Sequence, residues 1–536
     1  MEKVVVHLAN AGWEMSSSGC HAKGAAFTGT ELHRDGRLTE SLPPASAGTD
    51  EWAKTILRFN GFFAVVAIAD RQIVAAVDRV RSVPLFYGMA NGTFYLSDDA
   101  EWVRDQVGDI DMDPIGREEF KLAGYVTGPD TLFPHVKQIQ AGEMLCIDQA
   151  ESYEPVLTRY RYYRFAHTEP TDWNEGKLKA ELDEVLEATA RRLIDYANGR
   201  QIIIPLSGGY DSRLLAIALK KYGYPNILSF TYGVSRNREA EYSRIVAQAL
   251  DLPWVFVEYT KEKWLAAWGS DDRRRYQQKA SGYASLAHLQ DWLAVRELEN
   301  AGAVEEGAVF APGHTADFVA GGHIPICLAQ FEAGTRNRVA KEILRAHYSL
   351  APFNRISRRP HCFWLKRIDQ AAGGGVMFDI WEAADLYERW EWQERQAKFI
   401  VNAVQVYEFY GYNWWLPYWD AEFVEFWGRV PLSLRLGRRW YIQYVQGMGG
   451  TVQPGSSLGK IKNASRLSRI NAAAKKFASF GGEAFYNAAW GVFKGRQLER
   501  HPLNPYWRLD RDFVSRHLNK GYGLNGIDAE AFLREI

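Results

Sequence analysis

Between residues 4 and 163, apolar positions come in short runs that are broken by Gly, Asn, Asp and Pro. Apolar runs of about four to eight residues with turn signals between them are typical of β-strands. The runs at 62–69, 73–77, 93–96 and 144–147 therefore predict strands of an all-β or sandwich-like layer. The period of an amphipathic helix is scarce in this part of the chain.

A helical pattern begins behind a polar stretch at 168–173. Apolar residues between 178 and 193 recur on one face, and Asp172 followed by Glu175 resembles a capping box, which predicts that a helix starts there. We place a domain boundary at the same point, with one domain over 1–168 and a second over 169–536.

From residue 202 onward, strand-like and helix-like patterns alternate. Strands are predicted at 202–206, 227–231 and 254–259, with helices at 213–222 and 238–250. Such alternation is typical of a parallel sheet with right-handed crossovers, in which ligands bind at the carboxyl ends of the strands. The predicted fold class is therefore α/β, with a sandwich first and a parallel-sheet domain behind it.

Beyond Gly322 the pattern is mainly helical, and 381–444 is rich in Trp and Tyr. Aromatic rings stack on sugars as well as on each other, so this region allows a substrate platform or a hydrophobic core. The helical spacing of Val401, Val404 and Tyr407 favours the core. The C-terminal end of the chain gives no assignable signal.

Composition narrows the class of protein. A chain of 536 residues with 47% hydrophobic residues is long enough for two or more packed domains. The formal net charge of −1 gives no global electrostatic reason to bind nucleic acid or an acidic membrane. No apolar run is long enough for a membrane span, the N-terminus does not resemble a secretory signal, and the four cysteines are scattered, so we expect a cytoplasmic protein.

The strand at 202–206 runs into a turn with the sequence Ser-Gly-Gly-Tyr-Asp-Ser at 207–212, and a helix follows. Two glycines let the backbone approach a ligand closely, and the free amides and dipole of a helix N-terminus attract an anion. Asp211 would repel a phosphate unless a divalent cation lay between them, so the turn predicts Mg²⁺ as well as phosphate. The turn lacks the Lys of a Walker A motif, so γ-phosphate transfer is not indicated.

This turn resembles the pyrophosphate-binding loop (PP-loop) of the asparagine synthetase family, whose members activate a carboxylate as its acyl-adenylate. Three later segments are similar to family motifs in the same order: the adenine-side strand end at 229–233, the second acidic motif at 313–322, and 416–420 with the sequence Leu-Pro-Tyr-Trp-Asp. In the N-terminal part, the segments similar to the family's glutaminase domain, an N-terminal-nucleophile-hydrolase-like α+β sandwich, are 60–64, 78–87, 124–133 and 141–142.

The resemblance implies ATP and Mg²⁺ as cofactors. It assigns the metal to Asp211 and Asp317, and the nucleotide to Leu206, Ser207, Gly208, Gly209, Asp211, Ser212, Thr231, Tyr232, Gly233 and Gly313. A late Lys of the family lies near the α-phosphate, where negative charge builds up, and the candidates are Lys460 and Lys462. The plain alternatives are a helix cap or solvated loop for Asp317 and a solvated surface for the lysines.

Two positions depart from the family. Glutamine-dependent members begin Met-Cys-Gly, whereas this chain begins Met1-Glu2-Lys3, and a carboxylate cannot attack an amide as a thiolate does. The segments that grip glutamine are not found, and Cys20 is internal, so we predict a domain without glutaminase activity. At the second position, His314 replaces a family Glu, and it is a candidate general base, a candidate for orienting substrate, or a plain loop residue.

The predicted function is an ATP-dependent ligase that adenylates a carboxylate and joins it to ammonia or an amine, which a separate partner could supply. The carboxylate could belong to a small molecule, a saccharide or a peptide. Cyclising relatives such as β-lactam synthetase carry another side chain at the position of His314, so a β-lactam-forming or macrolactam-forming enzyme is an alternative. The sequence leaves open the nitrogen source, the carboxylate, and whether the chain forms a homodimer.

Two alternatives come from outside this reaction. An RNA-modifying PP-loop enzyme is disfavoured by the neutral net charge and by the absence of a thiol pair. A catalytically inactive scaffold that binds ATP, or nothing, is disfavoured because Asp211 and Asp317 are both present, and a nucleotide-free scaffold has no use for magnesium ligands.

Overall fold

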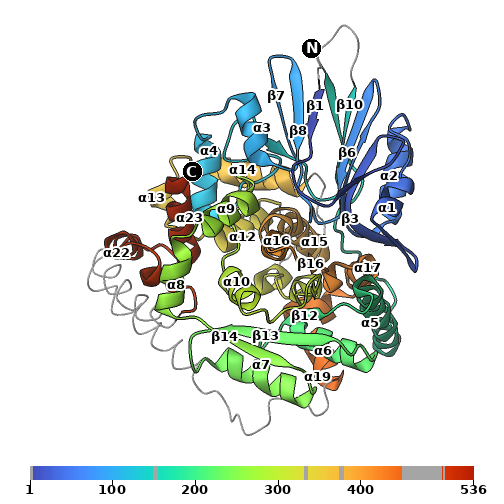
Figure 1. Cartoon of the computed structure of the whole chain (residues 1–536), viewed down its shortest axis with the longest axis vertical. Helices are drawn as coiled ribbons and strands as arrows, with labels where there is room; N and C mark the ends of the chain where they lie inside the picture. Colours follow the sequence, from blue (N-terminus) through green and yellow to red (C-terminus); the bar gives the residue numbers. More distant parts are fainter. Residues whose placement is uncertain (1–3, 149–154, 331–335, 374–378, 449–497, 499–500) are drawn as a thin grey trace.

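The computed structural model describes residues 4–148, 155–330, 336–373, 379–448, 498 and 501–536. Figure 1 shows strands of the N-terminal part at the top and a second sheet at the bottom, with a group of helices from the later part of the chain between them. The C-terminal helices α22 (Arg511–Asn519) and α23 (Leu524–Glu535) lie along the left-hand side of this view.

Two sheets form the N-terminal part. Among the described residues, one sheet has the order β1 (Val4–His7), β8 (Thr93–Ser97), β7 (Phe86–Ala90), β9 (Lys137–Gln138). The other has the order β11 (Val156–Arg161), β10 (Glu143–Asp148), β6 (Gln72–Val77), β5 (Asn60–Ile68), β3 (Cys20–Thr28), β2 (Trp13–Met15), with β4 (Glu31–Arg34) paired to β3. The four predicted strands are confirmed as β5, β6, β8 and β10.

The predicted α+β character is confirmed, since four helices lie between the described strands although helical periodicity is scarce in the sequence. They are α1 (Gly36–Glu40), α2 (Thr49–Arg58), α3 (Ala100–Val107) and α4 (Pro114–Ala123). Each is short, so its apolar face makes too few turns to show as a period. Local signals were present, because Asp99 and Asp113 cap α3 and α4 through their side chains, and Pro114 stands at the start of α4.

The predicted parallel sheet is confirmed. Its strand order is β14 (Trp254–Glu258), β13 (Ile227–Gly233), β12 (Ile202–Pro205), β15 (Val309–Phe310), β16 (Asn413–Trp414), and neighbouring strands pair in parallel. The crossover helices are α6 (Asp211–Lys221) and α7 (Arg238–Ala249). The capping box at 172–175 was wrong: α5 (Glu175–Ala197) begins after Asn174, whose side chain accepts the backbone N–H of Lys177 at 3.0 Å.

The predicted helical character beyond residue 322 is confirmed for the described residues. The longer helices in and before this part are α8 (Lys261–Trp268), α9 (Asp271–Ser281), α10 (Trp292–Asn300), α12 (Arg336–His347), α14 (His361–Ala372), α15 (Ile380–Glu391), the π-helix η2 (Trp392–Ile400), α17 (Ala421–Gly428) and α19 (Arg439–Met448). The aromatic residues of 381–444 lie mostly in the hydrophobic core, as the helical spacing predicts; among them are Trp392, Tyr407, Trp415, Trp427 and Tyr441.

A buried ion pair within the second domain also contacts the N-terminal sheet. The carboxylate of Asp420 accepts two hydrogen bonds from the guanidinium of Arg192, at 2.5 and 2.8 Å, and both side chains are nearly inaccessible to solvent. The same carboxylate accepts the side-chain amide of Asn60 at 3.1 Å, and Asn60 accepts the backbone N–H of Ala421 at 2.8 Å. The segments 60–64 and 416–420, far apart in sequence, therefore meet here.

In the part of the chain that the structure describes, no helix is both long enough and apolar enough to cross a membrane.

Removing Arg192 tests the ion pair. We expect Arg192→Ala to destabilise the protein by about 3 kcal/mol or more, because it leaves the Asp420 carboxylate buried without its main partner. The matched control is Arg191→Ala, since the neighbouring Arg191 is 61% exposed and pairs with Glu187 at the surface, where an ion pair contributes about 1 kcal/mol or less. Thermal unfolding midpoints of the three proteins give the comparison, and equal midpoints for the two variants would contradict the assignment.

Candidate active site

The candidate site lies at the carboxyl edge of the parallel sheet, where two loops leave neighbouring strands. One loop follows β12 and leads into α6, and the other follows β15 and leads into α11 (Ala316–Val319). The loops are in contact at Gly313, where a Cβ atom would lie only 2.5 Å from the backbone nitrogen of Ser212. A glycine is therefore needed at residue 313 to let the two loops meet.

This contact brings Asp211 and Asp317 together, although they stand 106 residues apart. The backbone N–H of Asp317 donates to Oδ2 of Asp211 at 3.3 Å. Oδ1 of Asp211 accepts the hydroxyl of Tyr441 at 2.8 Å, and the hydroxyl of Tyr418 donates to the Asp211 carbonyl at 2.9 Å. Burial, and then the negative charge of Asp317, raise the pKa of Asp211 above its usual range.

A charged network holds Asp317 from the other side. Nε2 of His323 lies 3.2 Å from Oδ2 of Asp317, and Nδ1 lies 2.5 Å from Oε1 of Glu391 on α15. Burial acts to lower the pKa of His323, but the charges of Glu391 and Asp317 and their hydrogen bonds raise it to about 10, so the imidazole is protonated. Burial acts to raise the pKa of Asp317, but His323 and then Arg438, 3.9 Å away, lower it below its usual range.

The two aspartates alone do not make a complete metal site. Among the described residues, no group of three or more His, Cys, Asp or Glu side chains lies in position to hold a metal ion. Mg²⁺ is usually bound through one or two carboxylates, with waters and substrate phosphates as the remaining ligands. Because a second negative charge raises the pKa of Asp211, the pair suits a cation that arrives with a phosphate.

The turn at 207–212 is held by its own hydroxyl groups. The backbone N–H of Ser207 donates to Oγ of Ser212 at 3.0 Å, and the N–H of Gly209 donates to Oγ of Ser207 at 3.1 Å. Gly209 is exposed, and Ser207 and Gly208 are half-buried, so the outer side of the turn faces solvent. Leu206 lies beneath the turn, fully buried in the hydrophobic core.

The strand end at 231–233 lies partly below the surface. The Thr231 hydroxyl is buried and contacts the Leu206 carbonyl and the Ser243 hydroxyl. The hydroxyl of Tyr232 donates to buried Asp291 at 2.7 Å, and its ring stacks on Tyr259 at 5.2 Å between centroids. Both side chains thus support the fold from within. Gly233, with φ of 147°, ends the strand in a conformation that favours glycine.

His314 lies in the second loop, three residues before Asp317. Its Nε2 atom is buried and has no hydrogen-bond partner among the described residues. Burial is the main cause that lowers the pKa of His314 to about 4. The imidazole is therefore neutral at physiological pH, which makes it a weak proton acceptor and a suitable hydrogen-bonding group for a neutral partner.

Other predicted residues lie elsewhere or outside the description. Lys460 and Lys462 fall within 449–497, and Glu2 within 1–3, so they lie outside the described residues. Cys20 is fully buried in a hydrophobic cluster, with its sulfur 3.5 Å from the carbonyl of Pro43. An internal, buried Cys20 has no free α-amine beside it and no access to a substrate.

The sequence interpretation missed four residues that contact the aspartate pair: Tyr418, Tyr441, His323 and Arg438. Tyr418 lies inside the recognised segment 416–420, and His323 directly follows the glycine pair at 321–322. Because both lie in or next to recognised motifs, the sequence could have indicated them as site residues. Tyr441 and Arg438 offered no such signal, because they reach the site from α19 and the turn before it.

Two family models match the chain. A glutamine amidotransferase domain matches residues 46–162, and an asparagine synthase domain matches residues 181–443.

Curated relatives match over part of their length. A putative glutamine-hydrolysing asparagine synthetase of Mycobacterium bovis is 28% identical over 212 residues, which cover 38% of this chain and 32% of the relative. Glutamine-hydrolysing asparagine synthetase 1 of Bacillus subtilis is 23% identical over 241 residues, which cover 44% of this chain and 37% of the relative. The matched part thus spans about a third of the length of these relatives.

Among solved structures, NAD+ synthetase from Burkholderia pseudomallei matches 45% of this chain and 88% of its own, with 16% identity and a TM-score of 0.19.

The histidine on the far side of Glu391 allows a test by pH. Burial lowers the pKa of His347 to about 4, although Glu391 acts to raise it, and its Nε2 lies 3.0 Å from the Tyr387 hydroxyl. This folded-state pKa lies below the unfolded value of about 6.5, so unfolding takes up a proton as the pH falls below 6.5. The stability associated with neutral His347 is therefore present above about pH 6.5 and is lost toward pH 4.

We expect His347→Gln, which keeps a polar group beside Tyr387 but cannot titrate, to lose less stability between about pH 7 and pH 5 than the unaltered protein. Thermal unfolding midpoints at several pH values measure this difference. His361→Gln is the control, because His361 is exposed. Parallel pH profiles for His347→Gln and the unaltered protein would contradict the prediction.

Proposed function

Because this chain joins a glutamine amidotransferase domain to an asparagine synthase domain, the arrangement of the asparagine synthetase family, we propose that it is an ATP-dependent carbon–nitrogen ligase. It adenylates a substrate carboxylate and transfers ammonia or an amine to it, without a glutaminase activity of its own. The products are an amide, AMP and pyrophosphate.

One observation carries this proposal: Asp211 and Asp317 lie in contact at the carboxyl edge of the parallel sheet, beside a Ser-Gly-Gly turn at the start of a helix. A turn of this kind binds phosphate through backbone N–H groups and the helix dipole. Two carboxylates at the same place would repel a phosphate alone. A divalent cation between the carboxylates and the phosphates would remove this repulsion.

The residues of the turn and the aspartate pair have separate roles in the proposed reaction. Ser207, Gly208 and Gly209 bind the departing pyrophosphate, and Asp211 with Asp317 would hold Mg²⁺, which when bound neutralises charge on the phosphates. An oxygen of the substrate carboxylate forms a bond to the α-phosphorus, and the bond from that phosphorus to the bridging oxygen of pyrophosphate breaks. The nitrogen of the second substrate then bonds to the acyl carbon, AMP leaves with the electron pair, and the nitrogen loses one proton to solvent.

The buried position of Cys20 supports an N-terminal domain that does not hydrolyse glutamine. Ammonia or an amine would then come from solution or from a separate partner. The four cysteines are all unpaired, which supports a reducing cytoplasm as the location.

A cyclising ligase is the second candidate, and His314 is the observation that favours it. A neutral imidazole, unlike the Glu of amide-forming relatives, does not attract an ammonium ion. It suits a neutral amine that is tethered to the activated carboxylate, which is the arrangement in a ring-closing reaction. Both candidates share the adenylation step and differ in the nucleophile.

Exchange of labelled pyrophosphate into ATP tests adenylation, with a panel of carboxylic acids that includes aspartate, uronic acids and acids carrying an amine. We expect exchange with at least one acid, and a loss of about a hundredfold or more in Asp211→Asn and Asp317→Asn, because the electrostatic support for the leaving group is removed. Asp195→Asn is the control, since Asp195 is exposed on α5. Undiminished exchange in either site variant would contradict the proposed roles.

The nitrogen source is tested with the acid that supports exchange. We expect product with ammonium chloride or with a free amine, and none with glutamine as the only nitrogen donor, because the proposed N-terminal domain has no glutaminase activity. Release of glutamate from glutamine is measured in parallel. Glutamate release by the purified protein would show that the N-terminal domain is an active glutaminase.

A further inference from the structure

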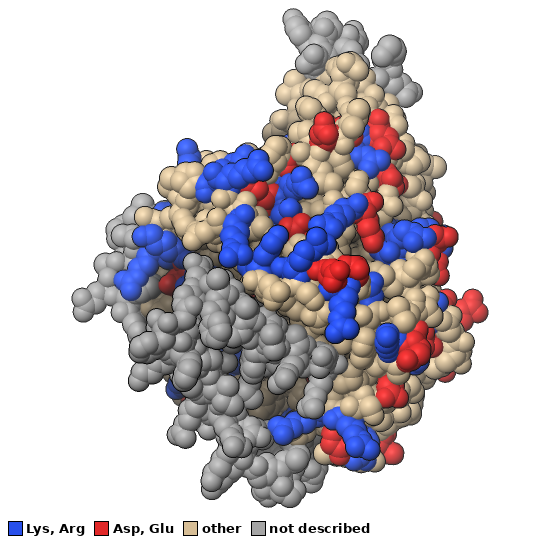
Figure 2. Space-filling model, turned by 90° about the vertical axis from the view of Figure 1, so that its left-hand side faces the viewer, with Lys and Arg blue, Asp and Glu red and all other residues tan. Residues whose placement is uncertain are grey.

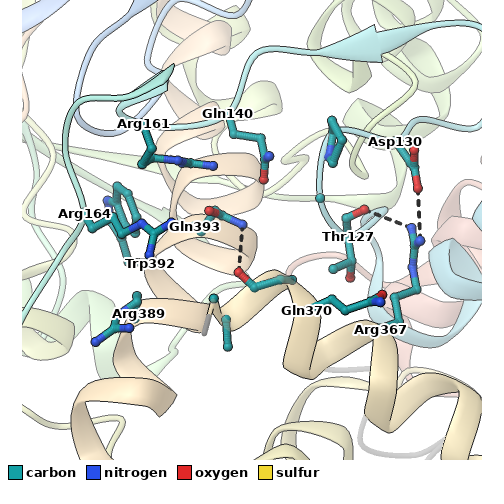
Figure 3. A pocket seen from close by; sticks show the side chains of 15 residues that line it. Thr127, Asp130, Gln140, Arg161, Arg164, Arg367, Gln370, Arg389, Trp392 and Gln393 are labelled. Atoms are coloured by element: carbon teal, nitrogen blue, oxygen red, sulfur yellow. Dashed lines mark hydrogen bonds and ion pairs between the residues drawn. The ribbon is translucent and has the colours of Figure 1, made fainter. Parts of the chain in front are cut away.

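A cavity of about 310 Å³ lies between the N-terminal domain and the helices α14, α15 and η2. Figure 3 shows its walls: Gln140 and Arg161 reach in from one side, Arg164 and Arg389 lie at one end, and Gln370 with Arg367 lies along α14. This volume is at the small end of the range for ligand pockets, about 300 to 1,000 Å³. The cavity is separate from the aspartate pair, because neither Asp211 nor Asp317 lines it.

The residues that line the cavity carry an excess of positive charge. Its lining includes four arginines and one acidic residue, Asp130. Arg367 is held by Glu119 and Asp130 at 3.0 Å, and Arg389 pairs with Asp385. These two guanidinium groups therefore have carboxylate partners.

The two arginines from the end of the N-terminal domain differ from these. Arg161 donates to the Ala141 carbonyl and comes no closer than 3.8 Å to its nearest carboxylate, Glu143. Arg164 has no hydrogen bond or ion pair with any described residue. Burial and the charge of Arg164 act to lower the pKa of Arg161, although Glu143 acts to raise it. Two neighbouring cations with this little compensation favour an anion between them.

Gln140 supplies an independent observation. Its side chain is only 7% exposed, and its carboxamide oxygen is buried without a hydrogen-bond partner among the described residues. The carboxamide points into the cavity (Figure 3). An unpaired buried polar group destabilises the folded protein. A ligand with an N–H or O–H group would remove that destabilisation.

The backbone at one end of the cavity makes room for Arg164. Gly373 has φ of 79°, and a Cβ atom there would lie 3.2 Å from a guanidinium nitrogen of Arg164. A side chain at residue 373 would therefore be strained by the backbone and would crowd the arginine. Glycine keeps the guanidinium group in place at the cavity wall.

We propose that this cavity is a binding site for a small organic anion that also carries a hydroxyl or amino group, with Arg161 and Arg164 binding the anionic group and Gln140 the hydroxyl or amino group. The bound anion can be a carboxylate or a phosphate ester, since guanidinium groups bind both. The site needs neither ATP nor catalysis, so it stands apart from the proposed ligase reaction.

The surface outside the cavity attracts anions. Figure 2 shows Lys and Arg side chains gathered across the face that carries α13 (Phe353–Ile356) and α22. The segment 336–367, which includes α12 and reaches into α14, has Glu342 as its one acidic residue, whereas its exposed basic residues are Arg338, Lys341, Arg345, Arg355, Arg358 and Lys366. The net charge of −1 for the whole chain does not reveal this local excess of basic residues. A basic face raises the local concentration of anions.

Isothermal titration calorimetry of the full chain without ATP tests the proposal. The probes are L-malate, L-glutamate and glycerol 3-phosphate, compared with succinate, which has the carboxylates of malate but no hydroxyl. We expect one-to-one binding of at least one of the three, and weaker binding of succinate than of malate if malate is bound. Heat from glycerol 3-phosphate alone identifies a phosphate ester as the preferred anion, and heat from the acids alone identifies a carboxylate.

Two variants and a control test whether the probe binds in this cavity rather than elsewhere on the protein. Arg164→Met should weaken binding of the preferred probe about tenfold, as expected for a charge-assisted hydrogen bond. Gln140→Leu should reduce binding of the preferred probe and abolish any preference for malate over succinate. Arg37→Met removes the same charge from an exposed residue elsewhere in the N-terminal domain and should have no effect. Thermal unfolding confirms that each variant is folded.

The proposal is wrong if none of the three probes binds the unaltered protein at about 10 mM, or if binding is the same in Arg164→Met and Gln140→Leu as in the unaltered protein. Binding lost equally in Arg37→Met would likewise contradict it, because the effect would then be one of net charge. Failure of pyrophosphate exchange has no bearing on these outcomes, since the titrations contain no ATP.

Discussion

Two carboxylates held side by side at a sheet edge are the feature on which the rest of this structure depends. Asp211 and Asp317 repel each other, and burial strengthens that repulsion because few water molecules screen it. The fold compensates locally: Tyr441 donates to one carboxylate, and protonated His323 contacts the other. Since Glu391 on α15 contacts His323, it also helps to hold Asp317 in position at the sheet edge.

This contact links the site to a distant part of the fold. Glu391 ends α15, and the π-helix η2 follows immediately at Trp392. Arg389, Trp392 and Gln393, on either side of Glu391, line the cavity between the domains. A π-helix places an extra residue in a turn, and such segments are frequent at functional sites. Within this short stretch, Glu391 contacts the aspartate network through His323, and Arg389, Trp392 and Gln393 line the cavity.

Local order in the sequence explains what could be predicted. The turn at 207–212 lies between a buried strand and a helix that are adjacent in the chain, so its position could be predicted from the local sequence. The parallel sheet followed from the alternation of strands and helices for the same reason. The start of α5 shows the limit, since Asn174 rather than Asp172 caps the helix, and both residue types serve as caps.

Long-range contacts explain what could not be predicted. Tyr441 lies 230 residues from Asp211, and Glu391 lies 68 residues from His323. Neither residue belongs to a pattern with its partner, because side chains that meet only in the folded state leave no periodic signal. Asp420 is a different case: its segment was recognised, but its carboxylate binds Arg192 and Asn60 and so supports the fold.

The contacts of Asp420 also show a structural role for the N-terminal domain. Asn60 of that domain binds the Asp420 carboxylate and caps the backbone at Ala421. At the other side of the molecule, Phe120 of α4 stacks on Phe532 of α23, with ring centroids 5.8 Å apart. The C-terminal helix thus packs on the N-terminal domain. Removing the domain would expose buried charge at one contact and buried aromatic surface at the other, so it has a structural role that does not depend on glutamine chemistry.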